Sequence, residues 1–144
     1  MLTDTHFNLL NEGLRPPIPY LNQGGCGWFA LYTHFALKKL GVQSTIHFAG
    51  VEGASLDLNK AVINRDLDTI HWNFSHVVIR VDGLYYDSNG VFTNGDLGLV
   101  ICEEPLPLRD FAMTFRMEYF YHDYYSYSNN GDLRYYIEHR LGLR

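Results

Sequence analysis

The sequence of 144 residues has few cysteines, no excess of basic residues and no long apolar run. Its two cysteines, Cys26 and Cys102, are too far apart for a metal-binding spacing or a disulfide framework. A formal net charge of −5 argues against a nucleic-acid-binding protein, because such proteins usually present a basic face. No segment approaches the ~18 consecutive apolar residues of a membrane span, so we expect no membrane partner.

The N-terminus lacks the basic region and the apolar stretch of a secretory signal. We therefore expect a cytoplasmic protein, with secretion by a non-classical route left open. Hydrophobic residues make up 47% and charged residues 19%, which are ordinary values for a globular chain. Without a repeat or a linker, residues 1–144 are expected to form a single catalytic domain that needs no metal or cofactor to fold. The 11 tyrosines are best explained as residues of a half-buried sheet and a loop.

Residues 1–25 are expected to be an irregular lead-in, because the prolines of segment 15–19 oppose regular structure. The glycine-rich turn of segment 21–27 then precedes a buried helix over 27–40, in which Trp28, Leu31, Tyr32 and Phe35 recur at helical spacing. Gly41 can end that helix.

Further elements follow from periodicity and turn signals. Asp82-Gly83 separates two β-rich runs, 75–81 and 84–88, and this is a strong signal of a two-residue hairpin. The other expected elements are a strand over 42–49, a short helix around 57–64, a strand over 111–121 and a helix over 133–141 capped by Asp132. Together they predict an α+β fold with an antiparallel sheet packed against the helix that begins at Cys26.

Cys26 is the candidate nucleophile. A thiol attacks a carbonyl only as the thiolate, and a helix N-terminus or a neighbouring imidazole stabilises that form. Cys26 follows Gly24-Gly25 and precedes a long helix, so its sulfur should lie at the helix start. Free backbone N–H groups there could hold the oxyanion of a tetrahedral intermediate. Cys102, in an apolar run, is instead expected to be a small buried hydrophobe.

His76 is the candidate base among seven histidines. If the hairpin loop is Asp82-Gly83, His76 lies opposite Asn89 and diagonal to Asp87 on the same face of the sheet. Either residue could orient the imidazole, as the third member of a catalytic triad does. The remaining histidines are expected to be surface or hydrogen-bonded core residues. Neither His71 with His76 nor His122-Asp123 has the spacing of a metal site.

Two segments carry a resemblance to a known family. Gln23-Gly-Gly-Cys-Gly-Trp-Phe-Ala30 resembles the nucleophile segment of papain-like (clan CA) cysteine peptidases. The run from His76 to Asp87 resembles the second half of that site, and Gly83-Leu-Tyr-Tyr-Asp87 is also similar to transglutaminase-like and arylamine-acetyltransferase-like enzymes. The resemblance implies a papain-like fold with Cys26 as nucleophile, His76 as general base and acid, and Asp87 as the orienting acid.

The resemblance implies a thiol hydrolase that cleaves a peptide, isopeptide or other amide bond through an acyl-enzyme. Transfer of the acyl group to an amine is the second interpretation, and a non-catalytic binding module that retains the fold is the third. In papain the oxyanion glutamine lies six positions before the cysteine, where this chain has Tyr20. Gln23 and Asn22 are the nearest side-chain candidates for that role, beside the backbone N–H of Cys26. The substrate and the oligomeric state stay open.

Overall fold

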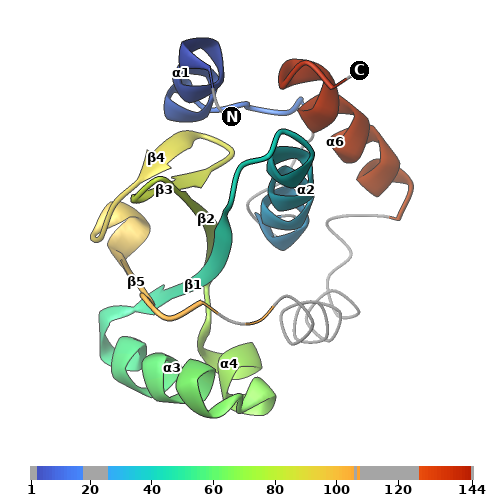
Figure 1. Cartoon of the computed structure of the whole chain (residues 1–144). Helices are drawn as coiled ribbons and strands as arrows, with labels where there is room; N and C mark the ends of the chain where they lie inside the picture. The colour runs from blue at the N-terminus through green and yellow to red at the C-terminus, as the bar shows by residue number, and fades with distance from the viewer. Residues whose placement is uncertain (1–2, 18–25, 106, 108–126, 144) are drawn as a thin grey trace.

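A curled antiparallel sheet forms the centre of the protein, with helices packed around it (Figure 1). The computed structural model describes residues 3–17, 26–105, 107 and 127–143. The expected strand over 111–121 lies outside these residues. The separate helices and antiparallel strands of the described chain confirm the α+β class predicted from the sequence.

The predicted hairpin forms the middle of the sheet. Strand β2 (His76–Val81) pairs with β3 (Leu84–Asp87), and Val81 lies opposite Leu84. Asp82 and Gly83 take φ angles of 51° and 84°, as a tight hairpin turn requires. The register along the hairpin is therefore the one that the two-residue loop predicts.

The sheet has the order β4-β3-β2-β1-β5. Strand β1 (Thr45–Val51) begins later than predicted and pairs with both β2 and β5 (Leu99–Ile101). Strands β4 (Gly90–Phe92) and β5 are joined through a short 3₁₀ helix, η2 (Asp96–Gly98). The sequence gives no strand signal for β4 or β5, because strands of three residues carry almost no periodicity.

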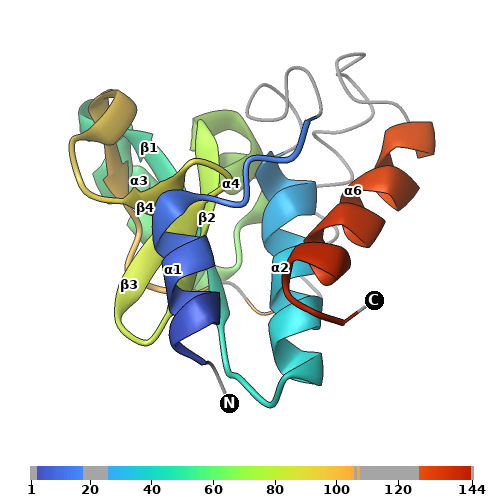
Figure 2. The same cartoon turned by 90° about the horizontal axis from the view of Figure 1, so that it is seen from above.

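Helix α2 (Cys26–Lys39) lies between the sheet and helix α6 (Tyr127–Arg140) (Figure 2). Its most deeply buried side chains are not those of the predicted stripe, and Phe35 is exposed. The buried set consists of Cys26, Phe29, Ala30, Thr33, Ala36 and Leu37. The sequence also makes the helix apolar on other faces, through Ala30, Ala36 and Leu37, and the structure buries all three, as expected for a helix covered on two sides.

The expected irregular lead-in over residues 1–25 is wrong, because helix α1 (Asp4–Glu12) lies within it. The side chain of Thr3 accepts a hydrogen bond from the backbone N–H of His6, and the His6 side chain accepts one from Thr3. This reciprocal pair is a capping box with histidine in the place of the usual glutamate or glutamine. The prolines that suggested irregular structure come only after Gly13 has ended the helix.

Three other helix boundaries differ from the predictions. Helix α3 (Glu52–Asn64) is longer than the expected short helix, and α4 (Leu67–Asn73) was not predicted. The side chain of Asp66 accepts a hydrogen bond from the Thr69 backbone and caps α4. Helix α6 begins at Tyr127, so Asp132 lies inside it rather than at its N-cap. Helix propensities are small enough to be outweighed by the rest of the fold.

The two faces of the sheet have different roles. The face toward α2 carries Phe48, Val77, Ile79, Val81 and Tyr86, which belong to the main hydrophobic core. The opposite face carries a smaller cluster of Ala49, Val78, Phe92, Leu99 and Ile101. Among the described residues, no helix has the length and apolar composition needed to cross a bilayer.

The capping box of α1 provides a test of the corrected N-terminus. Replacing Thr3 with Ala removes the cap and should lower the free energy of unfolding by about 1 kcal/mol. Thr5 is exposed on the same helix, so Thr5→Ala is the matched control and should leave stability unchanged or slightly higher. Urea unfolding of the two variants measures the difference. Equal stabilities would contradict the cap.

Candidate active site

Chain direction explains why Cys26 and His76 meet. Helix α2 is followed by a short turn and then by β1, which runs back along the helix (Figure 1). Strand β2 is antiparallel to β1, so α2 and β2 run in the same direction. Cys26 is the first residue of α2 and His76 is the first residue of β2. Both residues therefore lie at the same end of the structure.

Cys26 occupies the position that the glycine-rich turn predicts. Its side chain is 7% exposed and belongs to the main core. The first N–H groups of a helix have no partner within the helix, and the N-terminal end carries partial positive charge. A negative charge on the sulfur, or on an oxygen close to it, is therefore stabilised at this position.

His76 and Asp87 form a buried hydrogen-bonded pair. The Nε2 atom of His76 lies 3.0 Å from Oδ2 of Asp87, and the two residues are 1% and 7% exposed. The second carboxylate oxygen of Asp87 accepts a hydrogen bond of 2.8 Å from the backbone N–H of Asn89. Of the two partners considered from the sequence, Asp87 contacts the imidazole. Asn89 supplies its backbone, and its side chain is exposed.

The pKa of His76 is set by burial, which lowers it, and by Asp87 and Cys26, which raise it. Burial disfavours the imidazolium and is the largest single influence on its pKa. The hydrogen bond that the His76 ring donates to Asp87, the interaction with Cys26 and the negative charge of Asp87 act in the other direction. Together they raise the pKa of His76 to about 9. Nε2 of His76 contacts Asp87, and the thiol of Cys26 is close enough to the imidazole to influence its pKa.

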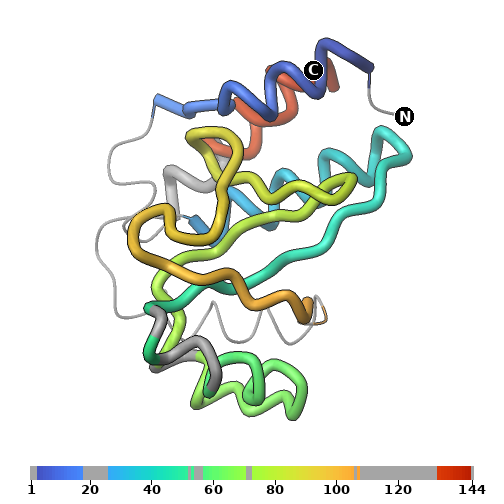
Figure 3. Tube along the Cα trace, turned by 90° about the vertical axis from the view of Figure 1, so that its left-hand side faces the viewer, coloured from blue at the N-terminus to red at the C-terminus, as the bar shows by residue number. Residues whose placement is uncertain are grey.

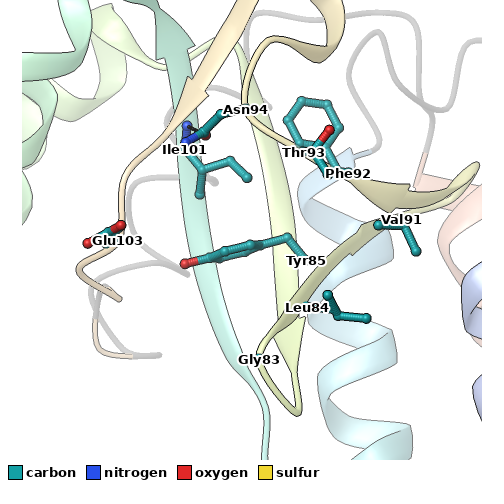
Figure 4. A pocket seen from close by; sticks show the side chains of 9 residues that line it. All are labelled: Gly83, Leu84, Tyr85, Val91, Phe92, Thr93, Asn94, Ile101 and Glu103. Carbon is teal, nitrogen blue, oxygen red and sulfur yellow. Dashed lines mark hydrogen bonds between the residues drawn. The ribbon is translucent and has the colours of Figure 1, made fainter.

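Phe92 completes the surroundings of the imidazole, although nothing in the sequence indicated it. Its ring centroid lies 5.2 Å from that of His76. Phe92 also lines a cavity of about 260 Å³ on the face of the sheet opposite α2, together with Tyr85, Ile101 and Glu103 (Figure 4). A single aromatic ring thus contacts both the imidazole and the cavity. Strand β4 has only three residues, which is too short for its sequence to show the alternation that would indicate this contact.

Two further histidines, His47 and His34, have structural partners. His47 is fully buried and bonds through Nδ1 to the carbonyl of Cys102 and through Nε2 to Thr45. Burial lowers the pKa of His47, so this imidazole stays neutral near pH 7. His34 bonds to Ser44 on the surface of α2. These contacts agree with the expectation of satisfied core or surface histidines.

Cys102 differs from Cys26 in its environment. Its thiol donates to the side chain of Asn59 at 2.9 Å, and it is 2% exposed. Burial raises the pKa of the Cys102 thiol, which disfavours the reactive thiolate. The sequence-based expectation of a buried, unreactive cysteine therefore agrees with its surroundings.

Some candidate residues cannot be placed. Gln23 and Asn22, the possible side-chain oxyanion donors, lie outside the described residues, as do Tyr20 and His122. Among the residues that the structure describes, no three His, Cys, Asp or Glu side chains gather as metal ligands would. The site is therefore defined by Cys26, His76 and Asp87, with backbone N–H groups around them.

Comparison with known proteins adds no identification. The chain matches no protein-family model, and it has no significant similarity to a curated protein or to a solved structure. The geometry of Cys26, His76 and Asp87 is therefore the basis for any assignment of function.

The raised pKa of His76 predicts how stability depends on pH. The folded-state pKa of about 9 exceeds the ordinary value of 6.5, so protonated His76 stabilises the fold. This contribution is complete below about pH 6.5 and is lost as the pH rises toward 9. Its size is on the order of 3 kcal/mol. Urea unfolding across this range should show stability falling with pH.

Asp87→Asn is the matched variant for this measurement, because it keeps the size of the side chain and removes its charge. The fall in stability between about pH 6.5 and 9 should become smaller in the variant. A wild-type stability that rises over this range, or an equal fall in both proteins, would contradict the assignment to His76.

Proposed function

We propose that this protein is a cysteine-nucleophile hydrolase that cleaves a peptide, isopeptide or other amide bond. The observation that carries the proposal is the buried group of Cys26, His76 and Asp87, in which the imidazole is hydrogen-bonded to the carboxylate and its pKa responds to the nearby thiol. A base that is in turn oriented by a carboxylate, beside a thiol at a helix start, is the arrangement that activates a nucleophile. The papain-like resemblance of the two sequence segments supports the same interpretation.

In the proposed reaction, His76 takes the proton of Cys26 and leaves a thiolate beside an imidazolium. The sulfur forms a bond to the substrate carbonyl carbon, and the carbonyl electron pair moves to oxygen. Backbone N–H groups at the start of α2 stabilise that oxyanion. The imidazolium then protonates the amine as the C–N bond breaks, which leaves a thioester on Cys26.

Deacylation returns the site to its resting state. Neutral His76 removes a proton from water, and the hydroxide attacks the thioester carbonyl. The acid product leaves as the C–S bond breaks, and Cys26 regains the proton or remains a thiolate beside the imidazolium. Asp87 keeps the ring oriented through both half-reactions, because its second oxygen is itself held by the Asn89 backbone. If an amine replaces water, the same intermediate gives acyl transfer.

The two cysteines provide an internal comparison for thiol activation. Iodoacetamide should label Cys26 at least tenfold faster than Cys102 near neutral pH, because burial raises the pKa of the Cys102 thiol. His76→Ala should slow labelling of Cys26. Peptide mass spectrometry over a time course measures both rates in one sample.

The matched control for this labelling is His34→Ala, since His34 lies on the same helix as Cys26 and its imidazole bonds to Ser44. This variant should label like the wild type. Equal labelling of Cys26 and Cys102 in the folded protein would remove the basis for an activated thiol.

Turnover is tested with activated acyl substrates, such as a series of p-nitrophenyl esters and aryl amides. Cys26→Ala and His76→Ala should each lower the rate on the order of 10³-fold or more. Intact-mass spectrometry should detect an acyl adduct that Cys26→Ala lacks. Adding hydroxylamine separates hydrolysis from transfer, because a transferase forms the hydroxamate in preference to the acid. A folded protein that forms no adduct with any ester would instead favour a non-catalytic module.

A further inference from the structure

The end of helix α1 meets the turn between β3 and β4 at unusually close range. A Cβ atom on Gly13 would lie 2.5 Å from the carbonyl carbon of Asn89. A Cβ atom on Gly90 would lie 2.5 Å from the carbonyl oxygen of Asn11. Both glycines also have positive φ angles, of 92° and 117°. The two segments therefore contact each other backbone to backbone, which only glycine permits at these positions.

Two hydrogen bonds join the same segments. The backbone N–H of Arg15 donates to the carbonyl of Ser88 at 2.8 Å. The hydroxyl of Tyr86 donates to Oδ1 of Asn11 at 3.0 Å. We call residues 11–15 the N-terminal clamp. Together these contacts hold the chain in place on both sides of Asp87.

The N-terminal clamp is itself anchored to the C-terminal helix. The Tyr136 hydroxyl donates to the carbonyl of Leu14 at 2.7 Å, and Leu14 is buried in the main core. Nε2 of His6 lies 3.1 Å from the carbonyl of Leu141. Figure 3 shows α1 (blue) and the C-terminal end of the chain (red) at the same end of the molecule. The N-terminal clamp is thus a fixed part of the fold.

The turn that the N-terminal clamp contacts is also the turn that orients Asp87. The backbone N–H of Asn89 points at Oδ1 of Asp87, which leaves Oδ2 for the imidazole. The position of this N–H depends on the path of the chain through Ser88 and Gly90. That path is set by the contacts with Gly13, Asn11 and Arg15.

We propose that the N-terminal clamp is a positioning element for Asp87, and that it keeps the carboxylate aimed at His76. Its catalytic importance rests on the proposed function, whereas its effect on the Asp87–His76 contact does not. No residue of the clamp touches the reacting groups in this proposal. The clamp acts through the Asn89 backbone, and its loss should weaken the hydrogen bond between His76 and Asp87 while leaving β2 and α2 in place.

Gly13→Ala tests the proposal, because the added methyl group must push the Asn89 backbone away. The matched control is Gly83→Ala in the turn of the same hairpin. Gly83 has a φ of +84° but nothing within 4 Å of an added Cβ, so this change brings strain without displacement of Asn89. Gly13→Ala should lower the pKa of His76 by at least one unit, and Gly83→Ala should leave that pKa within about half a unit of wild type. NMR titration of the His76 ring measures it.

If Gly13→Ala does not fold, a second variant, Tyr86→Phe, provides the same test. Tyr86→Phe removes one hydrogen bond to Asn11 and retains the buried ring, so it should lower the His76 pKa by a smaller amount in the same direction. An unchanged His76 pKa in folded Gly13→Ala, or in Tyr86→Phe where Gly13→Ala is unfolded, would overturn the proposal. A decrease of the same size in Gly83→Ala would also overturn it.

Iodoacetamide labelling of the same proteins separates this proposal from the proposed function. In Gly13→Ala, labelling of Cys26 should slow more than tenfold relative to Gly83→Ala. If wild-type Cys26 shows no enhanced reactivity, the proposed function fails. The His76 titration still decides whether the N-terminal clamp positions Asp87.

Discussion

A hydrogen bond of 3.0 Å joins His76 of β2 to Asp87 of β3. Two ionisable side chains are almost fully buried there, and burial of such groups is unfavourable unless they are paired and hydrogen-bonded. The pairing requires that the β2–β3 register be kept, since a shift of one residue would move one partner to the opposite face. It also requires a donor for the second oxygen of Asp87, and the next turn of the chain supplies it. The sheet is thereby organised around one polar pair in an apolar setting.

The central part of this arrangement could be predicted from the sequence because its signals are local. Asp82-Gly83 defines a two-residue loop, and the loop length determines which side chains share a face. Glycines before Cys26 and an apolar segment after it determine where a helix begins. From those two facts, Cys26, His76 and Asp87 follow as candidates. Nothing in either signal reports the distance between the cysteine and the hairpin, which depends on the direction of β1 between them.

The surroundings of the site could not be predicted, because they depend on contacts between distant segments. Gly13 and Gly90 look like ordinary helix-end and turn glycines, and only their mutual contact explains their close approach. Asn89 was considered for its side chain, whereas its backbone makes the contact with Asp87. Helix α1 was missed because prolines beyond its end outweighed a capping box that has an unusual member, His6. Phe92 belongs to a strand that is too short to show alternation.

The anchoring of α1 has a consequence for the order in which the protein is completed during synthesis. Chains emerge from the ribosome N-terminus first, so α1 is made long before its partners. The turn at 88–90 and helix α6, which hold α1 and the residues just after it, are made only after α2 and the first three strands. Helix α1 of nine residues has little stability on its own and must wait for both. The nascent chain therefore carries Cys26 well before the contact between His76 and Asp87 can form, because both residues and the segments that anchor α1 are made later.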